Sequence, residues 1–320
     1  MIVLSSGNNP YENLSIEEAL VNACKEGGSM REEVLKKPIM YLWINQPSVI
    51  IGRNQNIWRE CRLDEMKADG VLPVRRDTGG GAVFHDFGNL LFSFVMPSSV
   101  SLDYSYGVCI DALKTLGIES ERQGRNDIIA NGRKFSGSAY MNTGDISLHH
   151  GTMLIKSDLG RLARYLVPSK AKLQAKGVTS VQARVINLCE MRNDVEVQDV
   201  VDALIASYGD TPVQAAEVVD MANVQKAIDR RMSWDFLYGS TPPFDVQLEE
   251  RLSCGEVQLH LSLEKGHIKT LKIYTDALDA TLATRLEGAL MGVQFEGAAL
   301  ENATGAINED VAKWLGQLSL

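Results

Sequence analysis

Two stretches of the chain carry residues whose types and spacing could do chemistry. In the first, three consecutive glycines, Gly79–Gly81, follow two arginines, Arg75 and Arg76. Because glycines have no side chains, a ligand can lie against bare backbone, and peptide N–H groups can converge on an anionic oxygen. The Walker pattern is absent, and Phe84 stands where a Rossmann fingerprint needs a glycine. Taken alone, the run could equally be a glycine-rich turn between two strands.

The second stretch, residues 124–138, predicts a β-hairpin. Its two strands, 126–130 and 133–137, flank Asn131-Gly132, a pair that favours a two-residue type I′ turn and so fixes the register. Alternation then places Lys134 and Asp127 on one face, within reach of each other, together with Arg125, Ile129, Ser136 and Ser138. The expected partners are Ala130 with Arg133, Ile129 with Lys134, Ile128 with Phe135 and Asp127 with Ser136, and Ile128 and Phe135 face the core.

These groups suit the formation of a mixed anhydride between a carboxylate and a nucleotide. The sequence has no Gly-x-Ser-x-Gly elbow, no His-Glu-x-x-His motif and no paired Cys/His metal spacing. Backbone amides and an arginine would bind a carboxylate or phosphate, and Lys134 would offset charge on the oxygens that join. Asp127 could hold Mg²⁺ or a ribose hydroxyl. A solvated surface charge is the alternative role for Lys134.

Two histidines, His149 and His150, follow one another on an expected strand over residues 149–155. Adjacent strand residues point to opposite faces, so the pair is not expected to ligate one metal. We expect one histidine to be a hydrogen-bonded polar residue and the other to line a pocket.

Composition argues against several classes of protein. The net charge is -9 and no stripe of lysine and arginine occurs, which argues against nucleic acid as a partner. No apolar run approaches about 20 residues, so no membrane span is expected. Residues 1–6 lack a basic region and a cleavage pattern, so no signal peptide is expected. Five scattered cysteines indicate reduced thiols and a cytoplasmic protein.

Hydrophobic periodicity predicts the elements that position these stretches. Ser15-Ile16-Glu17-Glu18 has the pattern of a capping box that starts a helix, which Gly27-Gly28 ends. The break at Thr241-Pro242-Pro243 predicts a boundary between domains at 1–243 and 244–320. Further helices are expected at 62–69, 102–116, 158–166, 197–208, 215–232, 279–290 and 305–317, and further strands at 41–44, 48–52, 71–76, 89–96, 257–263 and 268–274.

The ordered set of motifs resembles the lipoate–protein ligase A family, in its long form with a small C-terminal accessory domain. The main matches are Arg76-x-x-Gly79-Gly80-Gly81-Ala82-Val83-Phe84-His85-Asp86, Gly124-Arg125-Asn126-Asp127, Lys134-x-Ser136-Gly137-Ser138-Ala139 and His150-Gly151-Thr152. Asn13-Leu14 with Glu17-Glu18, Gly52-Arg53-x-Gln55-Asn56 and Lys176-Gly177-Val178-x-Ser180-Val181 also match. The tail, with Trp234 and Pro243-Phe244, resembles the accessory domain.

The resemblance implies an α/β (α+β) fold. The large catalytic domain would have mixed, mostly antiparallel sheets flanked by helices, similar to the biotin/lipoate ligase fold, and the second domain would be small and α+β. Lipoate and ATP, with Mg²⁺, would give lipoyl-AMP and pyrophosphate, and the lipoyl group would then pass to a lysine of a lipoyl domain. Acceptors in the family are acyltransferase subunits of 2-oxoacid dehydrogenases and the glycine-cleavage carrier protein.

Roles for individual residues also follow from the resemblance. Lys134 would be the catalytic group, contacting both the lipoyl carbonyl and the adenylate phosphate. Residues 176–184 would cover the acyl-adenylate against water. Two positions depart from the family pattern: some relatives have a basic residue where this chain has Met141, and an arginine is common where it has Gln182. The nucleotide would contact Arg76, Gly81, Ala82, Val83, Phe84, Asn126, Asp127 and Lys134, with the metal on Asp127, and the acyl substrate would contact Leu14, Glu17, Trp43, Arg76, Thr78, His85, Lys134, Ser138 and His150.

Three alternatives stay open. An octanoyl- or lipoyl-transferase shares the scaffold but attacks with a cysteine, and no cysteine lies in the motif segments. A biotin ligase has differently arranged glycine motifs. A non-catalytic lipoate- or nucleotide-binding protein would have no need of Lys134, Asn126 and Asp127. Dependence on ATP distinguishes the first alternative, and lipoate-dependent exchange between ATP and pyrophosphate distinguishes the last.

Overall fold

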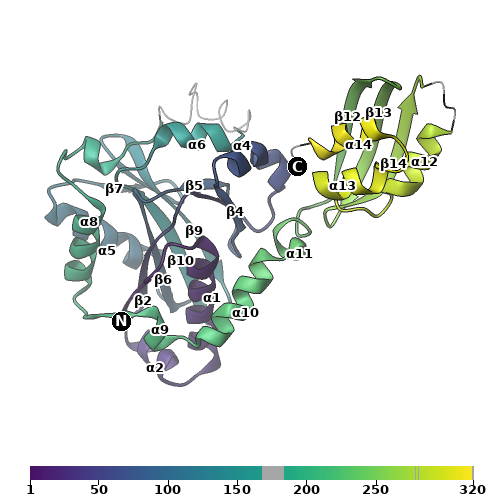
Figure 1. The fold of residues 1–320 in the computed structure, drawn as a ribbon. Helices are drawn as coiled ribbons and strands as arrows, with labels where there is room; N and C mark the ends of the chain where they lie inside the picture. The colour runs from purple at the N-terminus through teal and green to yellow at the C-terminus, as the bar shows by residue number, and fades with distance from the viewer. Residues whose placement is uncertain (168–183, 278, 280, 319–320) are drawn as a thin grey trace. The chain divides into compact units, whose positions relative to one another are not determined.

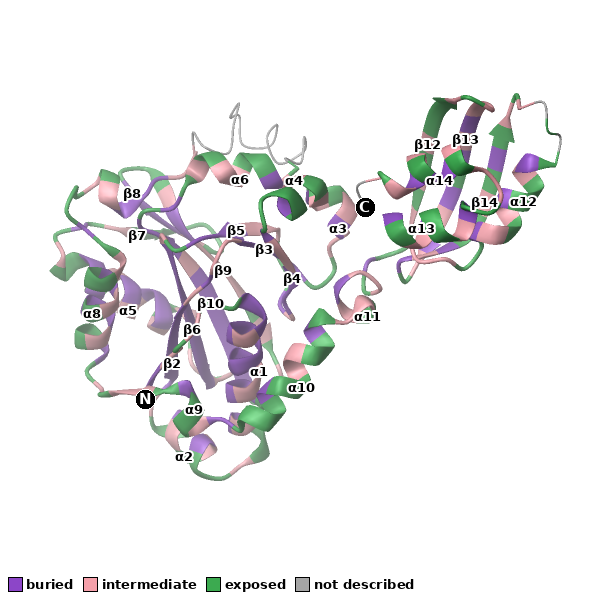
Figure 2. Cartoon of the chain, in the orientation of Figure 1, coloured by how far each residue is buried: buried purple, intermediate pink, exposed green. Residues whose placement is uncertain are grey.

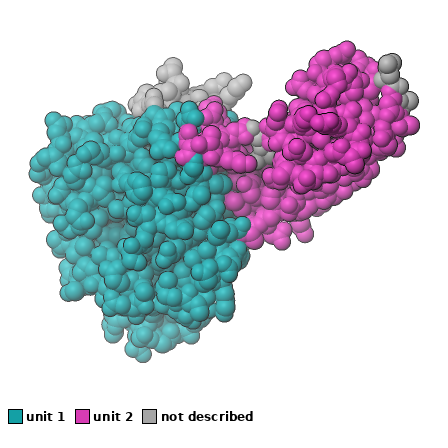
Figure 3. Space-filling model, in the orientation of Figure 1, with its two compact units in different colours: residues 1–53, 70–232 teal, residues 54–69, 233–320 magenta. Residues whose placement is uncertain are grey.

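The computed structural model describes residues 1–167, 184–277, 279 and 281–318 (Figure 1). The chain divides into two compact units. One unit comprises residues 1–53 and 70–232, and the other comprises residues 54–69 and 233–320 (Figure 3). The second unit is therefore built from two segments that are far apart in the sequence. The domain boundary expected at residue 243 stays a prediction.

An eight-stranded sheet forms the centre of the first unit. β1 pairs in parallel with β2 and β11, whereas the remaining neighbours pair antiparallel. The predicted fold class, with a mixed and mostly antiparallel sheet, is confirmed. The strand order is β11 (Pro212–Gln214), β1 (Ile2–Leu4), β2 (Ile39–Ile44), β6 (Asn89–Pro97), β10 (Ile146–Leu154), β9 (Arg133–Asn142), β8 (Asp127–Ala130) and β7 (Glu121–Gln123).

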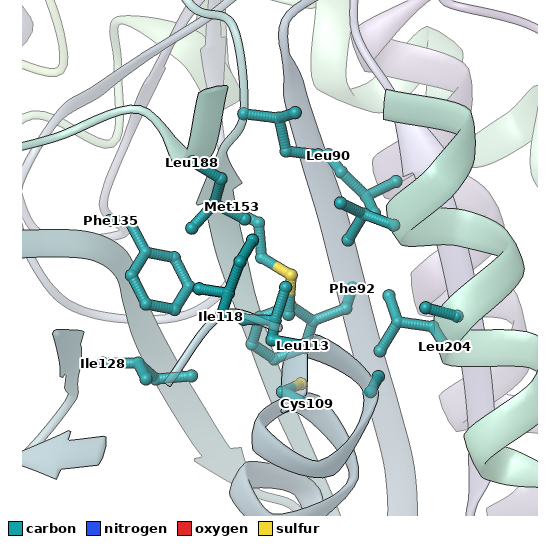
Figure 4. Packing of buried hydrophobic residues seen from close by; sticks show 14 of the residues in the cluster. Leu90, Phe92, Cys109, Leu113, Ile118, Ile128, Phe135, Met153, Leu188 and Leu204 are labelled. Atoms are coloured by element: carbon teal, nitrogen blue, oxygen red, sulfur yellow. The ribbon is translucent and has the colours of Figure 1, made fainter. Parts of the chain in front are cut away.

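Helices cover both faces of this sheet, and side-chain alternation along the strands fills both interfaces. On β2, Met40 and Leu42 join a buried cluster with α5 (Leu102–Thr115) and α8 (Val197–Tyr208), of which Figure 4 shows part. Tyr41 and Trp43 point the other way, into a second cluster with α1 (Pro10–Glu26) and α2 (Ser29–Lys36). The central strands are buried almost throughout (Figure 2).

A small second sheet carries the glycine-rich loop. β3 (Ser48–Ile51) pairs in parallel with β4 (Leu72–Arg75) and antiparallel with β5 (Val83–His85), so the loop that contains Gly79–Gly81 connects β4 to β5. The expected strand on each side of the loop is confirmed. The first unit also contains α6 (Leu159–Tyr165), the 3₁₀ turn η2 (Leu188–Glu190), α9 (Ala215–Val218) and α10 (Met221–Met232).

The predicted hairpin forms, but its register is correct only next to the turn. Asn131 has a positive φ, as the turn requires, and the pairs Ala130–Arg133 and Ile129–Lys134 are as expected. Beyond them a bulge at Phe135 shifts the register by one residue, so that Ile128 faces Ser136 and Asp127 faces Gly137. The prediction that Ser136 and Ser138 share the face of Lys134 is therefore wrong.

Two helix predictions also need correction. The first helix begins at Pro10, because the Asn9 side chain caps it by accepting from the N–H of Tyr11 at 2.9 Å. Ser15 lies inside that helix, where its hydroxyl donates to the carbonyl of Tyr11, and it caps nothing. The expected helix over 215–232 is divided into α9 and α10, because the Asp220 side chain accepts from the N–H of Ala222 and starts a second helix.

The second unit packs helices on a three-stranded antiparallel sheet. Its strands are β12 (Phe244–Leu252), β13 (Gly255–Glu264) and β14 (His267–Thr275), of which β12 was not predicted. The expected helices near 279–290 and 305–317 correspond to α12 (Leu282–Leu290) and α14 (Glu309–Gly316), with α13 (Gly297–Thr304) unpredicted between them. The remaining helices are α3 (Ile57–Glu60), α4 (Leu63–Ala68) and α11 (Trp234–Leu237).

A close backbone approach at Gly52 predicts a large effect of a small substitution. A Cβ at residue 52 would lie 2.2 Å from the carbonyl oxygen of Gly80, whereas a Cβ at Gly79 would meet nothing within 4 Å. We expect Gly52→Ala to lower the free energy of unfolding by about 1–3 kcal/mol, as overpacking does. Gly79→Ala is the control and should be nearly neutral. Denaturant unfolding of both variants measures this difference, and equal stabilities would contradict it.

Candidate active site

Lys134 and Asp127 form an ion pair across bare backbone. The Nζ of Lys134 lies 2.6 Å from Oδ1 of Asp127, and both side chains are half-buried. The two residues sit on the neighbouring strands β9 and β8, so the expected proximity is confirmed. A Cβ at Gly137, the residue opposite Asp127, would lie 2.5 Å from that Nζ. Any larger residue at position 137 would therefore require the Lys134 side chain to move from the position it has here.

The backbone around this pair is fixed by further hydrogen bonds. The N–H of Ile186 donates to the carbonyl of Lys134 at 2.9 Å, and the amide of Asn126 donates to the carbonyl of Ser138 at 2.9 Å. Ser138 itself turns away from Lys134, because its hydroxyl bonds the Tyr106 hydroxyl of α5 at 2.7 Å. The structure thus brings Asp127 to Lys134, bonds the Asn126 side chain to the backbone of Ser138, and places the Ser138 side chain on the other face of the sheet.

The Arg76 side chain donates hydrogen bonds to backbone carbonyl oxygens of the glycine-rich loop. Its guanidinium donates to the carbonyls of Gly79, Gly81 and Ile50 at 2.7, 2.8 and 3.1 Å, and the residue is only 6% exposed. Burial lowers the pKa of Arg76 to about 10, against the opposing effect of the Glu17 carboxylate, so the group stays cationic at neutral pH. In this arrangement the arginine orders the loop from within.

The loop lies beside the ion pair. A Cβ at Gly80 would be 3.9 Å from Cβ of Ala139, and Ala139 stands two residues along β9 from Gly137. Alternation puts Ala139 on the same face as Gly137 and the Lys134 side chain. The glycine-rich loop, the lysine and the aspartate therefore border one region of the sheet, as the hypothesis requires.

A chain of hydrogen bonds runs from the loop across four elements. Its links are Arg76 Nε to Thr78 Oγ1 (3.0 Å), Thr78 Oγ1 to His150 Nε2 (2.8 Å), His150 Nδ1 to Glu17 Oε1 (2.8 Å), Ser93 Oγ to the same Glu17 oxygen (2.5 Å) and Trp43 Nε1 to Ser93 Oγ (3.0 Å). All six residues are buried. The chain joins the loop to β10, α1, β6 and β2.

One assignment of protons satisfies every link of this chain. Arg76 and Trp43 can only donate, and the Glu17 carboxylate can only accept. Thr78 then accepts from Arg76 and donates to Nε2 of His150, whose Nδ1–H donates to Glu17. In this assignment His150 is the Nδ1–H tautomer, and its Nε2 faces the loop. His149 points into the opposite interface, where its Nδ1 bonds Ser105. The expectation that the two histidines face opposite sides is confirmed.

His85 belongs to a neighbouring polar cluster. The amide nitrogen of Asn45 donates to its Nδ1 at 3.0 Å, and Asn13 donates to the oxygen of Asn45 at 3.0 Å. Nε2 of His85 therefore carries the proton, and it is buried without a partner among the described residues. Burial, Arg76 and His150 lower the pKa of His85 to about 3, so the ring is neutral at neutral pH. An unpaired buried donor of this kind suits a ligand with an acceptor atom.

The remaining predicted residues lie around these groups. Leu14 is buried on α1, one turn before Glu17. Gly81 and Ala82 precede β5, which contains Val83 and Phe84. The Phe84 ring lies 5.3 Å from that of Tyr165 at the end of α6. Of the segment expected to cover the site, only Arg184 is described, and residues 176–183 with Gln182 lie outside the described part of the chain.

Sequence reasoning missed Gly137, Ser93 and Asn45 as parts of the site. Ser93 had a usable signal, because it is a lone small polar residue within an otherwise apolar buried strand. Such a residue needs a partner when buried, and here it has Trp43 and Glu17. Asn45 directly follows β2 and gave no comparable signal. Gly137 was visible within a matched motif, but its role depends on the bulge at Phe135.

Comparison with known proteins decides the family. Residues 9–209 match the model of the lipoyl protein ligase A/B catalytic domain, and residues 241–319 match that of the bacterial lipoate protein ligase C-terminus. The chain belongs to the lipoate–protein ligase A family. It is 36% identical to the lipoate-protein ligase A of Psychrobacter cryohalolentis, over 98% of this chain and 97% of that protein. As a family member it is an enzyme that ligates lipoate to protein.

Solved ligases share the fold. P. falciparum LipL1 in complex with lipoate has a TM-score of 0.65 and 31% identity, over 99% of both chains. A lipoate-protein ligase A bound with ATP has a TM-score of 0.61 and 26% identity, over 75% of this chain and 98% of that one. The bi-partite ligase of Thermoplasma acidophilum, described with its E2 lipoyl domain, has a TM-score of 0.62 and 26% identity, over 75% and 96%.

Two buried histidines predict a loss of stability in acid. The pKa values of His85 and His149 are each lowered to about 3, mainly by burial, whereas an unfolded histidine has a pKa near 6.5. Their contribution is present above pH 6.5 and declines as the pH falls toward 3. When the pH is lowered from 7.5 to 5, each histidine should lower the free energy of unfolding by about 2 kcal/mol. In His149→Leu this difference should shrink by about that amount in denaturant titrations, and an unchanged difference would contradict the assignment.

Proposed function

We propose that this ligase activates lipoate with ATP to lipoyl-AMP at the Lys134–Asp127 pair and then transfers the lipoyl group to a lysine of a lipoyl domain. The observation that carries the proposal is the ammonium group of Lys134, half-buried beside the glycine-rich loop and reaching Asp127 across Gly137. A fixed cation beside a backbone surface is the arrangement that a reaction between two anions needs.

In the first step a lipoate carboxylate oxygen attacks the α-phosphorus of ATP. The new bond joins that oxygen to phosphorus, and the bond from phosphorus to the β-phosphate oxygen breaks, releasing pyrophosphate. Lys134 would contact both the carboxylate and the α-phosphate, so it reduces their repulsion and offsets the charge that develops. To do so, Nζ must exchange its contact with Asp127 for contacts with the substrates.

Asp127 is then available to a metal. Mg²⁺ is commonly held by one or two carboxylates together with substrate phosphates. Asp127 is half-buried beside Asn126, and their oxygen donors suit that mode of binding. Among the described residues no group of three or more metal-ligating side chains lies together, so substrate oxygens and water would complete the coordination. When bound, Mg²⁺ would neutralise phosphate charge.

The acyl chain would lie against the α1 face of the sheet, near Trp43. The Trp43 ring is 4% exposed, is fixed through Nε1 to Ser93 and meets the His85 ring edge-on. The same chain of hydrogen bonds contains Glu17, Thr78 and His150. Leu14 packs in the same hydrophobic cluster as Trp43. The dithiolane and its apolar linker would therefore meet an aromatic wall, while the carboxylate end would reach Lys134.

In the second step the amine of an acceptor lysine attacks the acyl carbonyl, an amide bond forms and AMP leaves. We propose lipoyl domains of 2-oxoacid dehydrogenase acyltransferases and the glycine-cleavage carrier protein as acceptors. The Thermoplasma relative, described with its E2 lipoyl domain, supports the first class.

We further propose residues 1–243 as the catalytic domain and 244–320 as the accessory domain. No disulfide joins the five cysteines in the described part of the chain, which supports a cytoplasmic protein, and none of the described helices could span a membrane.

A transferase that uses a cysteine nucleophile fits the described thiols poorly. A reactive cysteine needs a low pKa and some exposure. Burial raises the pKa of Cys24 to about 12 and also raises the pKa of Cys109 and Cys189. The other two, Cys61 and Cys254, belong to the second unit. ATP dependence of the overall reaction is the discriminating measurement.

The proposal is tested by mass spectrometry of a lipoyl domain. The domain is incubated with the protein, ATP, Mg²⁺ and lipoate, and separately without ATP or without Mg²⁺. We expect the mass of one lipoyl group on the acceptor lysine only in the complete mixture. Modification without ATP would favour a transferase, and no modification with either acceptor class would refute the activity.

We expect Lys134→Ala to abolish lipoate-dependent exchange between ATP and pyrophosphate. The neighbour Arg133 supplies a matched control, because its exposed side chain pairs with Glu190 at 3.5 Å and lies on the other face of the strand. Arg133→Ala should keep nearly full exchange activity. Both variants should unfold at temperatures close to that of the unsubstituted protein. Near-normal pyrophosphate release by Lys134→Ala would refute the catalytic role.

We expect Trp43→Ala to admit longer or bulkier carboxylic acids, because it removes the proposed wall of the acyl pocket. Trp43→Phe keeps most of the bulk but loses the hydrogen bond to Ser93, so it should keep the original chain-length preference. Exchange assays with a series of carboxylic acids measure the profile. If the two variants accept the same acids as the unsubstituted enzyme, Trp43 does not line the pocket.

A further inference from the structure

Arg231 is a buried arginine that neither the sequence motifs nor the proposed chemistry uses. It lies in the last turn of α10, and its side chain is only 2% exposed. Its guanidinium contacts two carboxylates: Nη2 lies 2.7 Å from Oε2 of Glu18 and is in ion-pair contact with Oδ2 of Asp77. Nη1 donates to the carbonyl of Arg75 at 3.2 Å. One buried cation thus joins three points of the chain.

These contacts lie directly beside the site. Asp77 stands between Arg76 and Thr78, the first two members of the hydrogen-bond chain that reaches Glu17. Glu18 follows Glu17 on α1. Successive helix residues point about 100° apart, so Glu17 faces the sheet while Glu18 faces α10. Arg231 therefore contacts Asp77, which is adjacent to Arg76 and Thr78 in the loop, and Glu18, which is adjacent to Glu17 on α1.

The burial of Arg231 gives these contacts their importance. A charge removed from water needs close partners, and a guanidinium presents a planar fork that two carboxylates can hold at once. Glu18 and Asp77 are more exposed, at 28% and 27% of their side chains, so each alone could be solvated elsewhere. Arg230 also meets Glu18, at 2.6 Å, and Asp77, at 3.7 Å, but its side chain is 41% exposed. The buried arginine is the member that fixes the geometry.

We propose that Arg231 is a positioning residue for adenylation, which holds Asp77 so that Arg76 and Thr78 keep the glycine-rich loop and His150 in their binding geometry. This inference rests on the proposed function. Arg231 touches no substrate in it. Without Arg231, its contacts with the Asp77 carboxylate and the Arg75 carbonyl are lost. The substrates must then order the loop when they bind. Substrate binding should weaken, while chemistry in the filled site changes less.

The test compares Arg231→Gln with Lys226→Gln, which removes one exposed positive charge from the same helix. Lipoate-dependent exchange between ATP and pyrophosphate gives KM for both substrates and kcat. We expect KM for lipoate and for ATP to rise about tenfold in Arg231→Gln, with kcat within about threefold, and no change in Lys226→Gln. A merely structural role would lower kcat with the folded fraction and leave KM unmoved, and that result would overturn the proposal.

Asp77→Asn supplies a second variant, which removes the carboxylate charge and keeps the arginine. It should raise both KM values in the same way, and the double variant should be no worse than Arg231→Gln alone, because both changes break the contact between Arg231 and Asp77. Additive effects would overturn the proposal. Should Arg231→Gln fail to fold by circular dichroism, Asp77→Asn decides, and its unchanged KM values would refute the inference. Absence of exchange in the unsubstituted enzyme would instead refute the proposed function.

Discussion

The site depends on a cation buried inside a loop. Three consecutive glycines have more conformational freedom than any other run, and ordering them costs correspondingly more. Arg76 offsets that cost by donating to the carbonyls of Gly79 and Gly81 and to Ile50 of the adjoining strand. A buried charge without partners would be unfavourable, so the loop and the arginine each need the other. The loop is thereby ordered before any ligand arrives, which lowers the entropy cost of binding.

The polar chain from Arg76 to Trp43 crosses a region that is otherwise hydrophobic. Its members come from the loop, α1, β2, β6 and β10, and the Glu17 carboxylate accepts from both His150 and Ser93. A buried polar network stabilises a structure only when every member has a partner, and then it also favours one arrangement over others. The α1 face of the sheet thus forms half of the core and would also form the wall of the proposed site, whereas the α5–α8 face is mainly packing.

Much of this arrangement could be predicted from the sequence, because it follows from local rules. Alternation predicted that His149 and His150 face opposite sides, and the Asn-Gly turn predicted the approach of Lys134 to Asp127. The register beyond the turn could not be predicted, since the bulge at Phe135 carries no glycine or proline signal. The start of α1 was misjudged because Ser15-Ile16-Glu17-Glu18 fits a capping pattern, while Asn9 and Pro10 fit one better. Arg231 was invisible, since its partners are more than 150 residues away in the sequence.

The chain passes between its two units more than once, and this affects how it can be divided. Residues 54–69 belong to the second unit, where the Trp58 ring lies 5.6 Å from Tyr238, 5.4 Å from Phe244 and 6.1 Å from Phe295. A polypeptide truncated after Met232 would retain Trp58 and lose all three aromatic neighbours. The newly uncovered indole would favour aggregation of the shortened protein. Residues 233–320 form one continuous segment of the sequence. Even so, they cannot be removed without also disturbing the packing of residues 54–69.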